Sequence, residues 1–140
     1  MLIVQKYGGT SVADVERIKK VADYVVETAN SGKKVVVVVS AMAGETDRLL
    51  KLGHDAMGNF VCDREMDALV ATGEITTASL LAMAINSLGK KAVSLSAVQV
   101  PIMTDSEHQR ARMKYIETDR INKELKEGKI VVVEIGRAHV

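Results

Sequence analysis

Residues 35–44 read Val-Val-Val-Val-Val-Ser-Ala-Met-Ala-Gly. Five β-branched residues without polar alternation are typical of a parallel strand that is covered on both faces. In α/β domains, ligands bind beyond the carboxyl ends of such strands, where the chain enters a loop. This stretch therefore predicts both the fold class and the edge of the sheet at which a site would lie.

Further strands are predicted on both sides of this stretch. A short strand begins at residue 2 and is ended by Gly8 and Gly9. Two more are expected over residues 92–95 and 129–133, each a short apolar run after a charged entry.

Helical patterns fill the intervals between the strands. Ser11 and Asp14 resemble a capping box and are expected to open the first helix. A second helix is expected to begin near Glu45, and two more cover residues 63–88 and 117–126. This alternation predicts a mostly parallel sheet with helices on both faces.

Composition narrows the class of protein. The chain has 140 residues, 47% apolar and 26% charged, as expected of one modest globular domain. A formal net charge of +1 and 3% aromatic residues argue against nucleic acid and membrane surfaces as partners. The single cysteine, Cys62, cannot form an internal disulfide, and no segment resembles a signal peptide or a membrane span. These features indicate a cytoplasmic protein, and no metal-ligand spacing is seen.

The first motif that carries chemistry is Lys-Tyr-Gly-Gly-Thr-Ser at residues 6–11. Glycines let backbone amides approach a phosphate closely, and the helix N-terminus that follows adds partial positive charge. Lys6 is among the last residues of the strand, so its ammonium group is placed to meet a phosphoryl group at the sheet edge. The spacing is not that of a Walker loop. A tight turn beside a surface lysine is the alternative interpretation.

The second motif follows the buried strand at residues 40–47. The hydroxyl groups of Ser40 and Thr46 are suited to hold a ligand by hydrogen bonds, and Gly44 permits close approach of the backbone. The alternative is that Thr46 or a neighbour only caps the next helix.

The third motif, Thr-Gly-Glu at residues 72–74, is unusual within a helix. Gly73 costs a helix interior about 1 kcal/mol relative to alanine. Glu74 lies in an otherwise apolar segment, where a carboxylate favours a cationic partner such as a substrate ammonium group. The alternative is a solvent-facing glutamate at a helix kink.

Taken together, the three motifs resemble the N-terminal part of an aspartate kinase. Residues 3–11 match the opening signature of that family, residues 37–47 its second motif and residues 72–74 its third. The similarity covers nearly all of residues 1–133. One departure lies at residues 96–99, where the family usually has a glycine before the glutamine.

The resemblance implies a three-layer αβα sandwich with a mostly parallel sheet, the amino-acid-kinase fold, in truncated form. It implies ATP and L-aspartate as substrates, with Mg²⁺ accompanying ATP, and a homo-oligomer or a partnership with a regulatory subunit. Lys6 would contact the transferring phosphoryl group as the catalytic residue. The implied phosphate- and nucleotide-binding residues are Lys6, Tyr7, Gly8, Gly9 and Ser40, and the implied aspartate-binding residues are Thr46 and Glu74.

The end of the chain departs from the pattern before it, because the strand at residues 129–133 should run into a turn or a functional loop. Residues 134–140 read Glu-Ile-Gly-Arg-Ala-His-Val, which matches an in-frame translation of a common sequencing adapter. Natural sequence is therefore expected to end near Val133, within the catalytic domain, with a non-native tail after it. The later glycine-rich loop, the nucleotide half and the regulatory domains of the family would be absent, and the chain alone is expected to be inactive. A genuine C-terminal peptide is the alternative.

Other functions remain open at this stage. A kinase of the same fold that acts on glutamate, carbamate or UMP would share much of the pattern. A non-catalytic module for nucleotide sensing or oligomerisation is a different class of function. The second and third motifs favour aspartate by resemblance.

Overall fold

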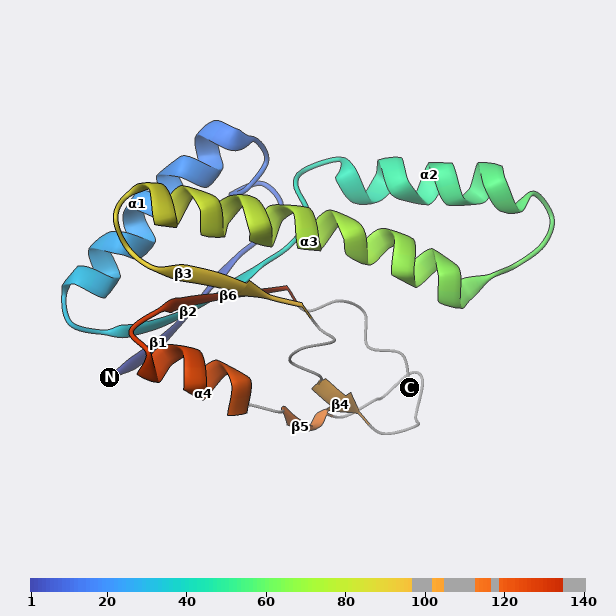
Figure 1. Ribbon diagram of the computed structural model, residues 1–140. Helices are drawn as coiled ribbons and strands as arrows, with labels where there is room; N and C mark the ends of the chain where they lie inside the picture. Colours follow the sequence, from blue (N-terminus) through green and yellow to red (C-terminus); the bar gives the residue numbers. More distant parts are fainter. Residues whose placement is uncertain (97–101, 105–112, 117–118, 135–140) are drawn as a thin grey trace.

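The computed structural model describes residues 1–96, 102–104, 113–116 and 119–134 (Figure 1). The elements follow in the order β1 (Leu2–Tyr7), α1 (Val15–Asn30), β2 (Lys34–Val39), α2 (Glu45–Met57), α3 (Asp63–Ser87), β3 (Ala92–Leu95), β4 (Ile102–Thr104), β5 (Met113–Ile116), α4 (Asp119–Lys126) and β6 (Ile130–Glu134).

Four of the strands form one parallel sheet, in the order β1-β2-β6-β3. The register pairs Tyr7 with Val39 and Val39 with Glu134, so these strands end at the same edge. β2 and β6 are the inner strands, which explains their valine-rich sequences and their burial. The predicted α/β class and mostly parallel sheet are confirmed.

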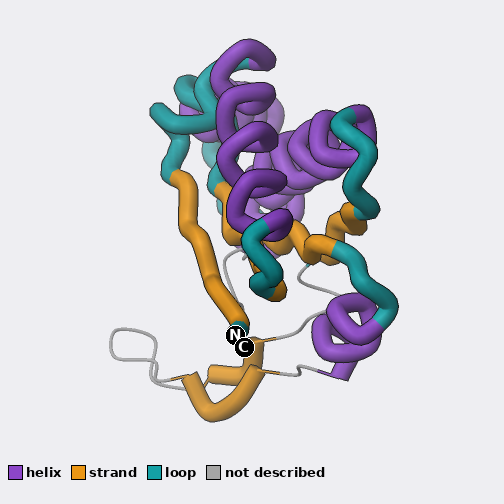
Figure 2. The backbone as a smooth tube through the Cα atoms, turned by 90° about the vertical axis from the view of Figure 1, so that its left-hand side faces the viewer, coloured by secondary structure: helices purple, strands orange, loops and turns teal. Residues whose placement is uncertain are grey.

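Helices cover both faces of this sheet. α1 and α3 pack on one face, around a core that includes Ile18, Val37 and Leu81. α4 packs on the other face, where Leu125 joins a smaller cluster with Val131. The two views in Figures 1 and 2 show the sheet between these helices. The domain is therefore a three-layer αβα sandwich.

The start of α1 differs from the prediction. The N-cap is Asp14, whose carboxylate accepts a hydrogen bond of 2.8 Å from the backbone N–H of Arg17, and the helix begins at Val15. The capping box opened by Ser11 is wrong, because the Ser11 N–H donates to the Gly8 carbonyl in a turn before the helix. Asp14 therefore acts as the cap itself rather than as its partner.

α2 and α3 form a helical pair that extends beyond the sheet (Figure 1). α3 buries residues along most of its length, from Val70 to Ile85, against the sheet, α1 and α2. It is the one helix of the described residues that is long and apolar enough to cross a membrane by length and composition. Its packing against three other parts of the fold accounts for a part of that apolar composition, since 39% of the apolar stretch is buried.

β4 and β5 pair antiparallel as a separate two-stranded sheet that the sequence did not predict. The fourth helix and the last strand lie where expected, although β6 continues to Glu134. All but the first residue of the departure at residues 96–99 and of the tail at residues 134–140 lie outside the described residues. The boundary near Val133 therefore stays a prediction.

Candidate functional site

Two loops leave the sheet side by side at its carboxyl edge. The β1–α1 loop comprises residues 8–14, and the β2–α2 loop comprises residues 40–44. The backbone N–H of Ser40 donates to the Tyr7 carbonyl at 3.3 Å, which extends the pairing of β1 and β2 into the second loop. The first two sequence motifs are thus brought together at the edge where α/β folds bind ligands.

The two loops touch through a glycine. A Cβ atom on Gly9 would lie 3.2 Å from the carbonyl oxygen of Ala41. A larger residue at position 9 would therefore push the loops apart. Gly8 has open space around its Cβ position, so its use is not explained by packing within the described residues.

α3 reaches the same point from the other side. A Cβ atom on Gly73 would lie 3.3 Å from the Ala41 Cβ, 3.2 Å from the Leu49 Cδ1 and 3.4 Å from the Glu45 Cγ. Gly73 is buried within a continuous helix, so the expected kink is not what this glycine provides. It allows α3 to pack closely on the β2–α2 loop and on the first turns of α2.

The second motif turns into α2 through Gly44. Its φ of 78° is in the left-handed region that favours glycine, and it stands at the N-cap without a side-chain capping bond. Thr46 is the second residue of the helix and half-buried, so the capping role considered for it is wrong. Its place in the first turn remains compatible with binding a ligand at this edge.

An ion pair stands beside Thr46. The Nε of Arg48 donates to Glu45 Oε2 at 3.1 Å, and the guanidinium also bonds the other carboxylate oxygen. Hydrogen bonding from Arg48 lowers the pKa of Glu45 below its ordinary value. The pair keeps Glu45 ionised next to the Gly73 contact.

Lys6 and Tyr7 point to opposite faces of β1. Gln5 donates from Nε2 to the Thr28 hydroxyl on α1 at 3.1 Å, and the Tyr7 hydroxyl donates to Gln5 Oε1 at 3.3 Å. Side chains alternate along a strand, so Lys6 lies on the face away from α1, where it is exposed. Its ammonium group can reach the sheet edge only from that face.

The Tyr7 ring faces α1 rather than the β2–α2 loop. It lines a shallow cleft of about 230 Å³ with Ser11, Arg17, Lys20, Val21 and Tyr24. Burial raises the pKa of the Tyr7 phenol above its ordinary value, and Tyr24 acts in the same direction. The part of Tyr7 that meets the second motif is its backbone carbonyl.

Glu74 follows the Gly73 contact on α3. Its side chain is half-buried, which does not match a fully solvent-facing glutamate. Gly73 packs on Ala41, and Ala41 packs on Gly9, so Glu74 is tied through two contacts to the first motif. Among the predicted site positions, Tyr7 and Ser40 are in direct contact, and Gly9 meets Ala41, the residue after Ser40. Gly8, Thr46 and Glu74 are each one residue away from Gly9, Glu45 and Gly73, which take part in these contacts.

The sequence did not predict a cleft that lies at this edge of the sheet. This cleft of about 110 Å³ lies between α3 and the ends of β3 and β6. Ile75 and Ala78 form one wall, and Ser94 and Ser96 contribute hydroxyl groups. Two serines near the end of a strand are a weak signal, because nothing local shows which helix will cover them.

Comparison with known proteins decides the family. The model of the amino acid kinase family matches residues 1–136. The chain belongs to the amino acid kinase family.

Its relatives in this family include curated aspartate kinases. An aspartate kinase of Pseudomonas fluorescens is 50% identical over 133 residues, and an aspartokinase of Pseudomonas aeruginosa is 51% identical over 132 residues. Each alignment covers 94% of this chain and 32% of the relative. The chain thus spans about a third of the length of these enzymes, and the resemblance found in the sequence is confirmed.

Solved structures agree with the fold. An aspartate kinase from Synechocystis has a TM-score of 0.79 at 43% identity, covering 95% of this chain and 21% of that one. A Giardia carbamate kinase has a TM-score of 0.73 at 13% identity, with coverage of 95% and 56%. The second similarity shows the amino-acid-kinase fold alone. The three-layer fold predicted for this family member is confirmed.

Proposed function

We propose that this chain is the aspartate-side part of an aspartate kinase. The complete protein transfers the γ-phosphoryl group of ATP to the side-chain carboxylate of L-aspartate and forms 4-phospho-L-aspartate. One observation carries the proposal. At Ala41 of the β2–α2 loop, Gly9 of the β1–α1 loop and Gly73 of α3 come into contact, and Gly73 directly precedes Glu74. Relatives about 50% identical that are named aspartate kinases support the choice of substrate.

The chemistry explains why this edge needs positive groups rather than a base. A carboxylate with a pKa of about 4 is ionised at neutral pH, so the nucleophile needs no deprotonation. The barrier is the repulsion between two anions, which cations, backbone amides and helix termini reduce. We assign Lys6 to the transferring phosphoryl group. We also assign Gly8, Gly9 and Ser40, which belong to the two loops at the carboxyl edge of the sheet, to contact with the phosphates through backbone or hydroxyl groups.

We assign binding of the amino acid to the α3 side of Ala41, opposite to Gly9. Glu74 would hold the substrate ammonium group and so orient the carboxylate that attacks. Thr46, in the first turn of α2, would add a hydroxyl hydrogen bond. The ordinary role of a glutamate as general base is not needed here, because the substrate is already ionised.

Mg²⁺ accompanies ATP in kinase chemistry and neutralises phosphate charge. Over the described part of the chain, no group of three His, Cys, Asp or Glu residues is placed to hold a metal ion. Mg²⁺ commonly binds through substrate phosphates with one or two carboxylates, so such a group is not required. We propose that the ion arrives with ATP, and we assign none of these residues to it.

The wider setting follows from the reaction. We propose a cytoplasmic enzyme in the first step of lysine, threonine and methionine biosynthesis, with ATP and L-aspartate as its small-molecule partners. A homo-oligomer or a pairing with a regulatory subunit is the expected assembly. Nucleic acid and membranes are not expected as partners, since the formal net charge is +1.

The test is a substrate comparison with the complete protein that contains this chain. Aspartate, glutamate, carbamate and UMP are offered with MgATP, ADP release is followed for all four, and acyl phosphates are trapped with hydroxylamine. We expect ADP release and hydroxamate with aspartate well above the others. A preference for glutamate, carbamate or UMP, or binding of nucleotide without turnover, would overturn the assignment.

The 140-residue chain on its own is a separate prediction. It carries the motifs of the amino-acid side but only about a third of the length of its relatives. We expect no aspartate-dependent turnover and a tendency to aggregate, since β1 is an edge strand with Leu2 and Val4 exposed. Hydroxamate formation and light scattering on the purified chain check this. A monodisperse, active monomer would contradict it.

A further inference from the structure

Ala41 is the point at which the two sides of the proposed site touch. Its carbonyl oxygen lies 3.2 Å from the Cβ position of Gly9, and its methyl group lies 3.3 Å from the Cβ position of Gly73. Gly9 belongs to the loop assigned to phosphate, and Gly73 precedes the glutamate assigned to the aspartate ammonium group. The residue between them has a methyl group and no larger side chain.

This contact has little room for any added group. Ala41 is only 6% exposed, so solvent does not separate it from its neighbours. A Cβ on Gly73 would also meet Leu49 and Glu45 of α2, at 3.2 and 3.4 Å. Close-packed interiors take up an extra methyl group by shifting whole elements, so α3 would move away from the loops by a few tenths of an ångström.

We propose that Ala41 and Gly73 are positioning residues that set the distance between Glu74 and the phosphate-binding loop at Gly9. The inference rests on the proposed function and concerns the same site. Neither residue touches a substrate in this scheme, and both act through the elements that they hold together. Transfer between two anions depends on alignment, so a small change in this spacing lowers the rate.

The decisive variant is Gly73→Ala in the complete protein. We expect kcat/KM for aspartate to fall by about tenfold, because a displacement of Glu74 misaligns the attacking carboxylate. KM for ATP is expected to stay within about twofold, since the β1–α1 loop is not on the α3 side of Ala41. Alanine favours helix more than glycine does, so loss of helix propensity cannot explain a fall in activity.

Gly53→Ala is the matched control. Gly53 is also a buried helical glycine, on α2, and its added Cβ would meet the end of the Met66 side chain at 2.5 and 2.6 Å and the Leu69 Cδ2 at 3.3 Å. A methionine end can rotate away at little cost, and this contact is remote from both loops. We expect unchanged kcat and KM values in this variant.

A methyl swap separates positioning from general destabilisation. In Ala41→Gly/Gly73→Ala the methyl group moves from the loop to the helix, which restores space at their contact. We expect kcat/KM for aspartate to recover by at least about threefold over Gly73→Ala, as coupling between contacting residues allows. Relief of overpacking can also restore stability, so the thermal midpoints of both variants are measured beside the kinetics. Recovery of kcat/KM at an unchanged thermal midpoint supports positioning, and recovery that only follows the midpoint overturns it.

The outcomes distinguish the inference from the function. A wild-type protein that forms no aspartyl hydroxamate overturns the proposed function and this inference with it. An active wild type whose Gly73→Ala variant behaves like Gly53→Ala overturns the inference alone. An impaired Gly73→Ala variant that the methyl swap does not rescue also overturns the inference and leaves the proposed function standing.

Discussion

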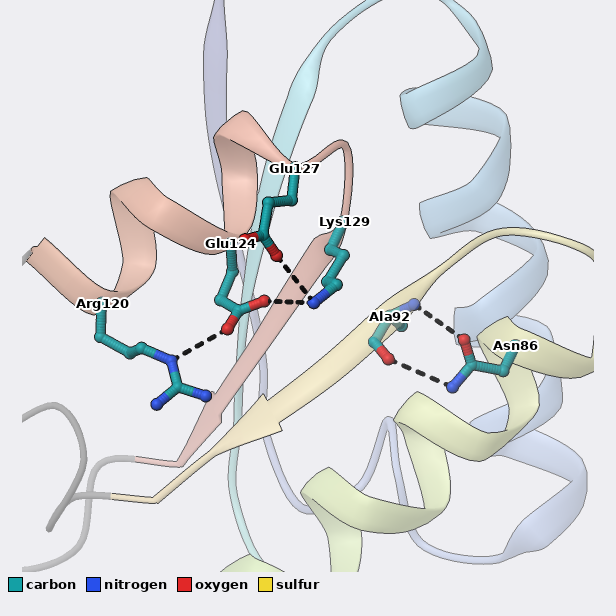
Figure 3. A network of polar contacts seen from close by, with 6 residues as sticks. All are labelled: Asn86, Ala92, Arg120, Glu124, Glu127 and Lys129. Carbon is teal, nitrogen blue, oxygen red and sulfur yellow. Dashed lines mark hydrogen bonds and ion pairs between the residues drawn. The ribbon is translucent and has the colours of Figure 1, made fainter.

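The two ends of the parallel sheet are held by different kinds of contact. At the amino ends of β3 and β6, charged and amide side chains form contacts (Figure 3), in addition to a backbone hydrogen bond from the Ile130 N–H to the Lys91 carbonyl. Lys129 Nζ lies 2.7 Å from Glu124 Oε2, and Asn86 both donates to and accepts from the backbone of Ala92, at 3.2 and 2.8 Å. At the carboxyl ends of β1 and β2, backbone and glycine contacts around Ala41 do the same.

The two kinds of contact should respond differently to substitution, one in the stability of the protein and the other in the spacing of its elements. A polar tie between side chains can be removed by substitution without moving the strands far, and its loss is felt mainly in the free energy of unfolding. A glycine contact has no side chain to lose, and an added methyl group moves one element against another. We therefore expect changes at the carboxyl edge to alter kinetics and changes at the amino edge to alter stability.

The largest effect is expected at Lys6. Lys6→Ala in the complete protein should lower kcat by about 10²–10³, as loss of a donor to developing charge typically does. The thermal midpoint should hardly change, because the Lys6 side chain is exposed. Lys34→Ala is the matched control, since Lys34 is an exposed lysine at the amino end of the neighbouring strand. Similar kcat values in both variants would contradict the assignment of the catalytic function to the carboxyl edge of the sheet.

Glu74 comes next. Glu74→Gln keeps the size of the side chain and removes its charge, so KM for aspartate should rise by about tenfold or more, the usual scale for a hydrogen bond to a charged group. KM for ATP should change little. Glu65→Gln, at an exposed position in the first turn of α3, should leave both values unchanged. An equal loss for both substrates would indicate a deformed site instead.

Arg17 tests whether the β1–α1 loop needs a side-chain tie as well. Its Nη1 donates to the Thr10 carbonyl at 2.7 Å, which fixes the loop against α1. Arg17→Ala should lower kcat/KM for ATP by about threefold to tenfold, as expected for one hydrogen bond at an exposed site. Lys19→Ala serves as control, because Lys19 is exposed and its ion pair with Glu16 is long, at 4.0 Å. Full activity in Arg17→Ala would show that backbone contacts alone hold the loop.

The smallest kinetic effect is expected at Glu124, at the opposite end. Hydrogen bonding from Lys129 holds the pKa of this carboxyl below its ordinary value, and a further bond from Arg120 acts in the same direction. Glu124→Gln should lower the thermal midpoint by a few degrees and leave kcat and KM unchanged. Glu127→Gln should lower the thermal midpoint less, because the Glu127 side chain is 47% exposed and its ion pair with Lys129 is therefore more hydrated.

The difference in stability between the wild type and Glu124→Gln should depend on pH in one direction. A carboxyl whose pKa is depressed by folding stabilises the protein above its unfolded pKa, and this contribution is lost as pH falls through the folded value. The stability gap between wild type and Glu124→Gln should therefore be full above pH 4.5, the ordinary value for this group, and shrink on acidification. Thermal unfolding of both proteins between neutral pH and pH 3 measures it. A gap that grows with acid would contradict the ion-pair interpretation.

Local sequence patterns were enough to predict the order of the main elements, the parallel sheet and the three motifs. A run of valines specifies a doubly covered strand, and glycine-rich turns specify where strands end. The local pattern does not select the N-cap of α1, because both Ser11 and Asp14 suit that position and the path of the preceding turn decides for Asp14. The face on which Lys6 emerges, opposite to Tyr7, depends on where α1 packs.

The way in which the motifs are joined depends on packing between elements. Residues 9, 41 and 73 are far apart in the chain, and no local period encodes that a carbonyl of one loop will face a glycine of another. Within its own helix Gly73 costs stability, and its use becomes visible only when Ala41 and α2 are packed against it. A local sequence pattern predicts which face of a helix or strand is buried. The spacing between two elements depends on contacts between distant residues, and these form only when the helices pack on the sheet.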